Sequence, residues 1–226
     1  MINGYKLTLK KSKEDHRNFK LNLQEDDKQI DFKDSFALID INKLKIYDRG
    51  NLGSCTANSI AQAIQIKTNN LISICRIFQY FNSRLLEGTQ YQDDGYSILD
   101  ALKALIKYKY IKEELYPYIT SNYDKFPPSS VYIEASKNKI NKYISVDQDL
   151  YHIKYVLSVY LQPIIVGISI YSSFQNLDSN YCVQMPSENE TLLGRHCVLI
   201  IGYNDNDNTC VLCNSWGTKW GDHGKF

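Results

Sequence analysis

The sequence predicts an α+β protein in which a helical lobe is followed by an antiparallel β lobe. Three stretches in the first half repeat apolar side chains at helical spacing. The last third carries short runs rich in β-branched residues, which are typical of strands. Proline-containing segments separate the two patterns. We therefore expect an N-terminal arm over residues 1–46, a helical lobe over residues 47–128 and a β lobe over residues 129–226.

The helical pattern is strongest directly after Ser54, where apolar residues recur at helical spacing. These residues are Ala57, Ile60, Ala61 and Ile64. A second helix is expected over residues 73–86, because Gly88 lies just beyond the last apolar position and glycine commonly ends helices. A third helix is expected to begin near Ser97.

The second half predicts one helix and three strands. Residues 149–161 are expected to be helical, with Asp149 as the N-cap. The apolar run over residues 164–170 predicts a buried strand. Residues 197–203 and 209–214 predict the two strands of a hairpin, because an Asn- and Asp-rich segment lies between them.

Composition and charge are those of an ordinary globular protein, with 43% hydrophobic residues, 23% charged residues and a net charge of +1. Such a balance gives no attraction to nucleic acid or to an acidic membrane surface, so neither is an expected partner. The start has no apolar core like that of a signal peptide, and no run reaches the roughly 18 apolar residues needed to cross a bilayer. We therefore expect a cytoplasmic protein; the oligomeric state is not indicated.

The six cysteines are expected to be reduced thiols, because the chain is long and lacks a signal peptide. They are Cys55, Cys75, Cys182, Cys197, Cys210 and Cys213. The last two have the spacing of a zinc-binding pair. A structural zinc site needs about four ligands, however, and no second pair is present, so no metal is expected.

Cys55 is the candidate nucleophile. It stands at the expected start of the strongest helix, where the helix dipole stabilises a thiolate. Gly53, two residues earlier, allows a sharp turn and a close approach of the backbone to a substrate. A buried structural thiol remains the alternative for this position.

His196 is the candidate base among four histidines, because it heads a strongly apolar strand that would hold the ring rigidly. Asn214 ends the partner strand, so the hairpin would bring its amide oxygen to the ring and fix the tautomer. Trp216 would pack over the pair and exclude water. A core histidine and a core tryptophan remain the alternatives. Arg195 would disfavour an imidazolium if its side chain pointed inward.

Three motifs in this order resemble the papain-like cysteine peptidases. They are Gly-Asn-Leu-Gly-Ser-Cys at 50–55, His196 before a strand with Gly-Tyr at 202–203, and Asn-Ser-Trp-Gly-Thr-Lys-Trp-Gly at 214–221. The resemblance extends from about Tyr47 to Phe226 and includes Leu-Glu-Gly at 86–88 and Asp-Asp-Gly-Tyr at 93–96. It implies a two-lobe papain-like fold with an active-site cleft between the lobes.

The resemblance implies a role for each matching residue. Cys55 would attack a peptide carbonyl, His196 would hold and deliver the proton, and Asn214 would orient His196. The Cys55 N–H would donate to the oxyanion together with Arg49, which stands where family members usually carry glutamine. Because arginine differs in charge and reach, this change is expected to weaken activity. The substrate-binding residues would be Gly53, Ser54, Asp94, Gly95 and Trp216, and no cofactor is implied.

Two departures from the secreted relatives, Leu52 and Thr56, fit the shorter variants of bacteria and large DNA viruses, which resemble this chain in lacking a disulfide and a long prodomain. If the chain is viral, association with the virion is an additional expected location. Residues 1–46 are too short and too weakly patterned for an independently folded inhibitory prodomain. Relatives continue beyond the position of Phe226 into a final strand, so either the β lobe closes differently or that strand is missing.

The function implied is that of a cysteine endopeptidase that cleaves extended polypeptides through an acyl-enzyme. Two alternatives stay open. One is a weak or inactive peptide-binding protein on the same scaffold, which Arg49 favours. The other is a cysteine-dependent acyltransferase, because an amine as well as water can resolve an acyl-enzyme.

Overall fold

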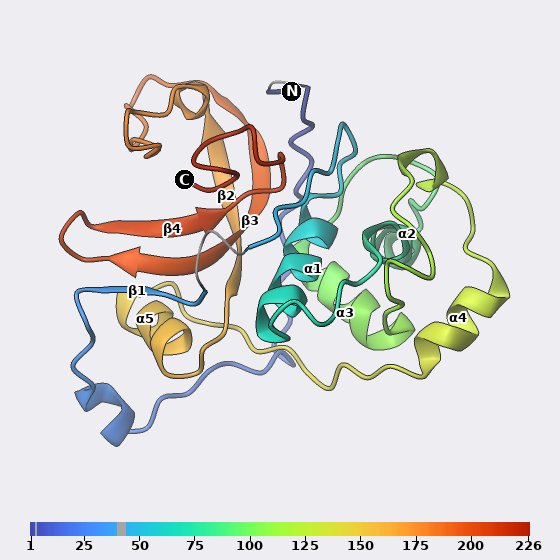
Figure 1. The fold of residues 1–226 in the computed structure, drawn as a ribbon, viewed down its shortest axis with the longest axis horizontal. Helices are drawn as coiled ribbons and strands as arrows, with labels where there is room; N and C mark the ends of the chain where they lie inside the picture. Colours follow the sequence, from blue (N-terminus) through green and yellow to red (C-terminus); the bar gives the residue numbers. More distant parts are fainter. Residues whose placement is uncertain (3, 40–43) are drawn as a thin grey trace.

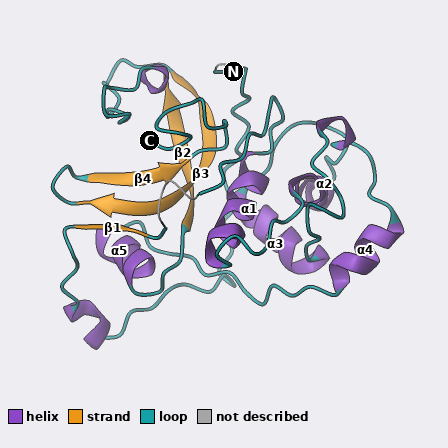
Figure 2. Ribbon diagram, viewed as in Figure 1, coloured by secondary structure: helices purple, strands orange, loops and turns teal. Residues whose placement is uncertain are grey.

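Most helices gather on one side of the molecule, and the strands lie with one further helix on the other, so the expected α+β fold with two lobes is confirmed (Figures 1 and 2). This computed structural model describes residues 1–2, 4–39 and 44–226. The helices of the first lobe are α1 (Cys55–Lys67), α2 (Arg76–Glu87), α3 (Ile98–Tyr108) and α4 (Ser129–Ser136). The second lobe contains α5 (Leu150–Ser158) and the strands β1 (Ser35–Ala37), β2 (Ile164–Tyr171), β3 (Leu192–Asn204) and β4 (Thr209–Cys213). Short 3₁₀ helices lie at Asp26–Gln29, Thr120–Asn122 and Ser172–Gln175.

Local capping explains where three of these helices begin and end. Ser97 accepts a hydrogen bond from the Asp100 N–H at the start of α3, and Asp149 accepts one from the His152 N–H at the start of α5. Gly88 follows α2 in the left-handed conformation, with a φ of 74°, which glycine adopts without a steric penalty. The expected positions of α2, α3 and α5 are therefore confirmed to within a few residues.

Helix α4 has no counterpart among the elements expected from the sequence. Its Val131 and Ala135 are buried in the core of the helical lobe, and Tyr132 donates to Asn82 of α2 over 2.9 Å. The helical lobe therefore continues past the boundary expected at residue 128. Prolines at 127 and 128 precede α4 rather than separate the lobes, since proline is readily accommodated at a helix start.

Strand β3 is the centre of the antiparallel sheet. Its first part pairs with β2, where Ile168 lies opposite His196. Its second part pairs with β4 on one edge and with β1 on the other, where Phe36 lies opposite Tyr203. The segment expected to be an extended arm or loops thus contributes β1 to the β lobe.

Helix α1 lies between the two lobes, which explains a burial pattern that its apolar periodicity did not predict. One side contacts the helical core, and Ile66 at the other end packs with Leu199 and Ile201 of β3. As a result its polar residues Asn58 and Gln62 are also buried. The position of α1 places its N-terminus at the junction of the lobes (Figure 1).

Within the described residues, all six cysteines are free thiols and no group of three or more metal-ligating side chains is present. In the same part of the chain, no helix combines the length and the apolar character that crossing a bilayer requires.

Candidate active site

Cys55 is the first residue of α1 and only 1% of its surface is exposed. The loop before it is held in place from the helical lobe, since the Gly53 N–H donates to Asp93 Oδ1 over 2.8 Å. The Ser54 hydroxyl shares a hydrogen bond of 2.8 Å with the hydroxyl of Tyr118. These bonds fix the turn that presents Cys55 at the helix N-terminus, where the dipole favours a thiolate.

His196 and Asn214 are brought together by the β3–β4 pairing, as the sequence predicted. His196 Nε2 lies 2.8 Å from Asn214 Oδ1, and the same oxygen accepts a bond of 2.7 Å from the Ser215 N–H. Because an amide oxygen only accepts, Nε2 must carry the hydrogen. The other ring nitrogen, Nδ1, is buried and has no hydrogen-bond partner among the described residues. It is therefore free to accept a proton.

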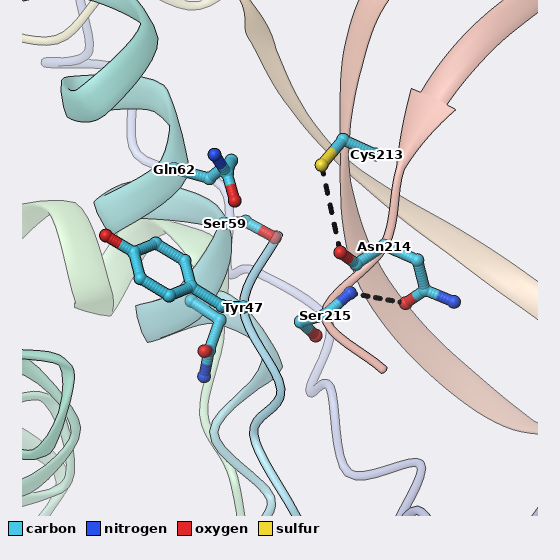
Figure 3. A pocket seen from close by; sticks show the side chains of 7 residues that line it. Tyr47, Ser59, Gln62, Cys213, Asn214 and Ser215 are labelled. Atoms are coloured by element: carbon cyan, nitrogen blue, oxygen red, sulfur yellow. Dashed lines mark hydrogen bonds between the residues drawn. The ribbon is translucent and has the colours of Figure 1, made fainter. Parts of the chain in front are cut away.

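A small void separates the Asn214 segment from α1 (Figure 3). Ser59 and Gln62 of α1 line one side, and Cys213, Asn214 and Ser215 line the other. The Asn214 carboxamide nitrogen is buried without a partner among the described residues. The orientation of the Asn214 carboxamide is thus set by the hydrogen bonds that its oxygen accepts from Ser215 and His196.

Trp216 forms one wall of the site. Its ring stacks on the His196 imidazole with centroids 5.1 Å apart, and it is 2% exposed. The ring of Tyr5 stacks on the same indole, with centroids 4.8 Å apart and planes inclined by 10°. The predicted packing of Trp216 on the candidate base is therefore present, and it excludes water from the ring.

Arg49 is fully buried beside these groups. Its guanidinium donates to the carbonyl oxygen of Leu52 through Nη1 and to that of Lys6 through Nη2, the latter over 2.5 Å. Burial lowers the pKa of Arg49, and a negative charge on Cys55 would act in the opposite direction. Arg49 is therefore a buried cation whose Nη1 and Nη2 donate to backbone carbonyl oxygens, while its Nε has no partner among the described residues.

The pKa of His196 is lowered from 6.5 to about 3, first by burial and then by the positive charge of Arg49. The hydrogen bond that the ring donates to Asn214 Oδ1 acts in the opposite direction. A neutral ring is therefore favoured at physiological pH in this structure. Arg195, which the sequence analysis singled out, has an exposed side chain, so the cation that acts on the ring is Arg49.

The N-terminal arm crosses the junction of the lobes. The Leu9 N–H donates to the Arg195 carbonyl of β3, and the Lys10 N–H donates to the Tyr96 carbonyl of the helical lobe, each over 3.3 Å. We call residues 5–10 the seam strand, although this extended segment makes isolated β-bridges, to Arg195 and Ser97 among others, and is not part of a sheet. Figure 1 shows this part of the chain descending from the N-terminus between β3 and α1. The candidate site is thus covered by a segment of its own chain.

The seam strand contacts several residues predicted to bind substrate. A Cβ atom added to Gly53 or to Gly95 would overlap Thr8, so both glycines permit a close backbone approach. Ser54, in contrast, is turned toward Tyr118 and Asn58. Asp94 is exposed, and the neighbouring Asp93 is the carboxylate that contacts the strand.

Sequence reasoning missed Asp93 and the arm as parts of the site. A signal was present, because residues 6–10 alternate lysine or threonine with leucine, as a strand with two different faces does. The pattern is short, however, and nothing in it identifies the surface that it covers.

Comparisons with known proteins agree with this geometry. Residues 28–226 match the family described as papain family cysteine protease. An uncharacterized peptidase C1-like protein of Acanthamoeba polyphaga mimivirus is 36% identical over 194 residues, which are 79% of this chain and 62% of that relative. Vignain of Vigna mungo is 28% identical over 211 residues, which are 86% of this chain and 52% of vignain. The chain thus spans between half and two thirds of the length of these curated relatives.

Among solved structures, xylellain, a cysteine protease from Xylella fastidiosa, superimposes with a TM-score of 0.90. The match covers 100% of this chain and 90% of xylellain, at 29% sequence identity. The similarity therefore includes both lobes and the arm.

Proposed function

Because the chain belongs to the papain family of cysteine proteases, we propose that it is an endopeptidase that cleaves extended polypeptides through an acyl-enzyme on Cys55. The observation that carries the proposal is the 2.8 Å bond between His196 Nε2 and Asn214 Oδ1. This bond fixes the tautomer in which Nδ1 accepts a proton, and Nδ1 has no other partner among the described residues. A histidine held in this way is a general base.

In the proposed reaction, the Cys55 thiol transfers its proton to His196 Nδ1 and the sulfur attacks a peptide carbonyl carbon. The carbonyl π electrons move to oxygen, where the Cys55 N–H at the start of α1 donates to the oxyanion. When the tetrahedral intermediate collapses, the C–N bond breaks and the imidazolium gives its proton to the leaving amine. Water then attacks the thioester, with His196 again as the base, and releases the carboxylate and the thiol.

Arg49 is proposed as the second donor to the oxyanion and as a weaker one than a neutral amide. Its guanidinium is buried and already donates to a peptide carbonyl oxygen, that of Lys6. Its fixed charge, however, also lowers the pKa of His196. An intermediate that contains an imidazolium is disfavoured beside such a charge. We therefore propose that the arginine reduces the rate relative to a glutamine at this position.

Covalent trapping tests the proposal. The native protein, in a reducing buffer, is treated with an epoxide that labels papain-type thiolates, and the modified cysteine is located by mass spectrometry. Stoichiometric labelling of Cys55, with much slower labelling in His196→Ala, is expected. Five other thiols serve as internal controls, since burial raises the pKa of Cys75, Cys197 and Cys213. If Cys55 is labelled in neither protein, the chain is not a cysteine peptidase of this kind.

Product analysis separates the peptidase from the acyltransferase. A fluorogenic peptide is incubated with the protein in the presence and absence of an added primary amine. Hydrolysis as the main reaction is expected, because the proposed acyl-enzyme is resolved by water. Amide products that exceed the carboxylate at millimolar amine would instead assign the chain to acyl transfer.

A further inference from the structure

The two faces of the seam strand have different chemistry. Side chains in a strand alternate between opposite faces. Lys6, Thr8 and Lys10 are directed at the helical lobe, where they contact Asp93, Gly53 and Glu87 respectively. The two leucines between them are directed at the β lobe, and they lie against glycines of β2 and β3. The seam strand therefore indicates which side chains the helical lobe and the β lobe each accept at their junction.

Two carboxylates hold the lysines. Lys6 Nζ lies 2.5 Å from Asp93 Oδ2, and Lys10 Nζ lies 2.7 Å from Glu87 Oε2. Asp93 is oriented by the helical lobe itself, since its Oδ1 accepts from the Gly53 N–H and from the Tyr80 hydroxyl. Its Oδ2 is thereby left for the cation. With the seam strand in place, the side chains of Asp93 and Glu87 are 11% and 19% exposed, so each carboxylate is partly desolvated where it meets the lysine.

The β-lobe wall accepts aliphatic side chains. A Cβ added to Gly167 would lie 2.7 Å from a methyl group of Leu9, and one added to Gly194 would lie 2.8 Å from Cβ of Leu7. Larger residues at these two positions would remove the space that the leucines fill. Leu7 also packs in the apolar cluster that contains Trp216.

The central position, occupied by Thr8, lies against two glycines. Gly53 and Gly95 lie so close to Thr8 that a Cβ on either would overlap it. The sequence of residues 6–10, Lys-Leu-Thr-Leu-Lys, is the same in both directions. A substrate with this pattern would therefore place basic side chains toward the helical lobe and aliphatic side chains toward the β lobe whether it ran parallel or antiparallel to the seam strand.

From this arrangement we propose that the junction selects polypeptide segments with the pattern basic, aliphatic, small, aliphatic, basic. Asp93 and Glu87 select the two basic side chains, and Gly167 and Gly194 leave room for the aliphatic ones. The inference deepens the proposed function, because it assumes that substrates occupy the path of the seam strand. It assigns to Asp93 and Glu87 a substrate preference that neither the charge balance of the chain nor the sequence motifs indicated.

The test compares three capped peptides with the cores Lys-Leu-Thr-Leu-Lys, Gln-Leu-Thr-Leu-Gln and Glu-Leu-Thr-Leu-Glu. Binding to the Cys55→Ala protein is measured by fluorescence anisotropy at low salt, and cleavage by the native protein is measured as kcat/KM. Because the seam strand competes equally with all three peptides, its effect cancels in the ratio of two affinities. A ratio of about 5 to 20 in favour of the lysine peptide over the glutamine peptide is expected from two partly exposed ion pairs.

Glu87→Gln is the test variant and Glu134→Gln is its control, because Glu134 on α4 pairs with Lys137 and with no other cation among the described residues. Glu87→Gln should lower the lysine-to-glutamine ratio by about threefold, and Glu134→Gln should leave it unchanged. A ratio near one, a ratio insensitive to Glu87→Gln, or no binding of any peptide would overturn the inference. Selective binding to Cys55→Ala without cleavage by the native protein would instead overturn the proposed function alone. Equal cleavage of all three peptides would overturn the inference alone.

Discussion

The backbone of Thr8 lies against Gly95 so closely that residue 95 has no room for a side chain. Gly95 has a φ of 64°, in the left-handed region that favours glycine. Thr8 and Gly95 are 87 positions apart in the sequence, and the contact joins the arm to the helical lobe beside Cys55. A substrate that uses this backbone surface must therefore displace the seam strand.

Weakening the hold on the seam strand should raise activity. The double variant Lys6→Ala with Lys10→Ala removes two ion pairs that are each worth up to about 1 kcal/mol, because the lysines are partly exposed. We expect kcat/KM for an uncharged fluorogenic peptide to rise severalfold at low salt, mainly through a lower KM. The difference in kcat/KM between the variant and the native protein should shrink at about 0.5 M salt. The Debye length is then about 4 Å, so screening weakens the same ion pairs.

Lys137→Ala is the control for this experiment, because it removes the lysine that pairs with Glu134 of α4. It should leave kcat/KM unchanged at every salt concentration. An unchanged or lower kcat/KM in the double variant would show that the seam strand does not compete with substrate.

Replacing Arg49 by glutamine should raise kcat. The change supplies a neutral donor and removes the charge that lowers the pKa of His196. A gain of about tenfold is expected, because a complete and well-placed oxyanion donor is worth about 10² to 10³ and arginine retains part of that effect. The measurement is kcat at saturating peptide, where competition from the seam strand no longer contributes. Arg49→Ala, which lacks a donor, should show no gain. A kcat that is unchanged or lower in Arg49→Gln would mean that arginine is an adequate donor.

Removing the Asn214 side chain should affect both stability and turnover. In Asn214→Ala the buried Nε2–H of His196 loses its acceptor, which is expected to cost about 1 to 3 kcal/mol of the free energy of unfolding. Turnover should fall, but by less than the roughly 10² to 10⁴-fold loss expected for His196→Ala, because the base itself remains. Urea denaturation and kcat measure the two effects. Asn180→Ala, at an exposed position, is the control. A variant with native stability and native kcat would show that Asn214 does not position His196.

The free energy of unfolding should decrease as the pH is lowered through a range set by His196. Its pKa is about 3 in the folded protein, against 6.5 for an unperturbed histidine. Between these values the unfolded chain binds a proton that the folded protein does not, so lowering the pH favours unfolding. From pH 6.5 to pH 5 this amounts to as much as about 2 kcal/mol. Denaturation curves for native protein and His196→Asn at both pH values isolate this contribution. Parallel pH dependence in the two proteins would contradict the burial of a neutral ring.

The local pattern of the sequence predicted the elements that carry the candidate nucleophile, base and orienting amide. Cys55 begins α1 because a helical repeat starts directly after Ser54, and the hairpin pairs His196 with Asn214 because its two apolar runs flank a turn. These features depend on residues that are close in sequence, where periodicity and turn chemistry act. Helix α4 escaped prediction because the prolines before it suggested a boundary.

The choice between Arg49 and Arg195 as the cation near His196 shows the limit of this reasoning. Arg195 is adjacent to His196 in the sequence, but neighbours in a strand point to opposite faces, and its side chain is exposed. Arg49 reaches the site from a loop 147 positions earlier, held by the carbonyls of Leu52 and Lys6. No local pattern reports such a contact.

By itself, then, the sequence determined the α+β order of elements and the types and positions of the chemical groups, because short-range spacing encodes both. Only the tertiary structure decided that residues 5–10 lie across the junction of the lobes, that Asp93 rather than Asp94 faces them, and that the His196 ring is neutral. These outcomes depend on burial and on charges contributed by distant segments, and burial is a property of the packed molecule.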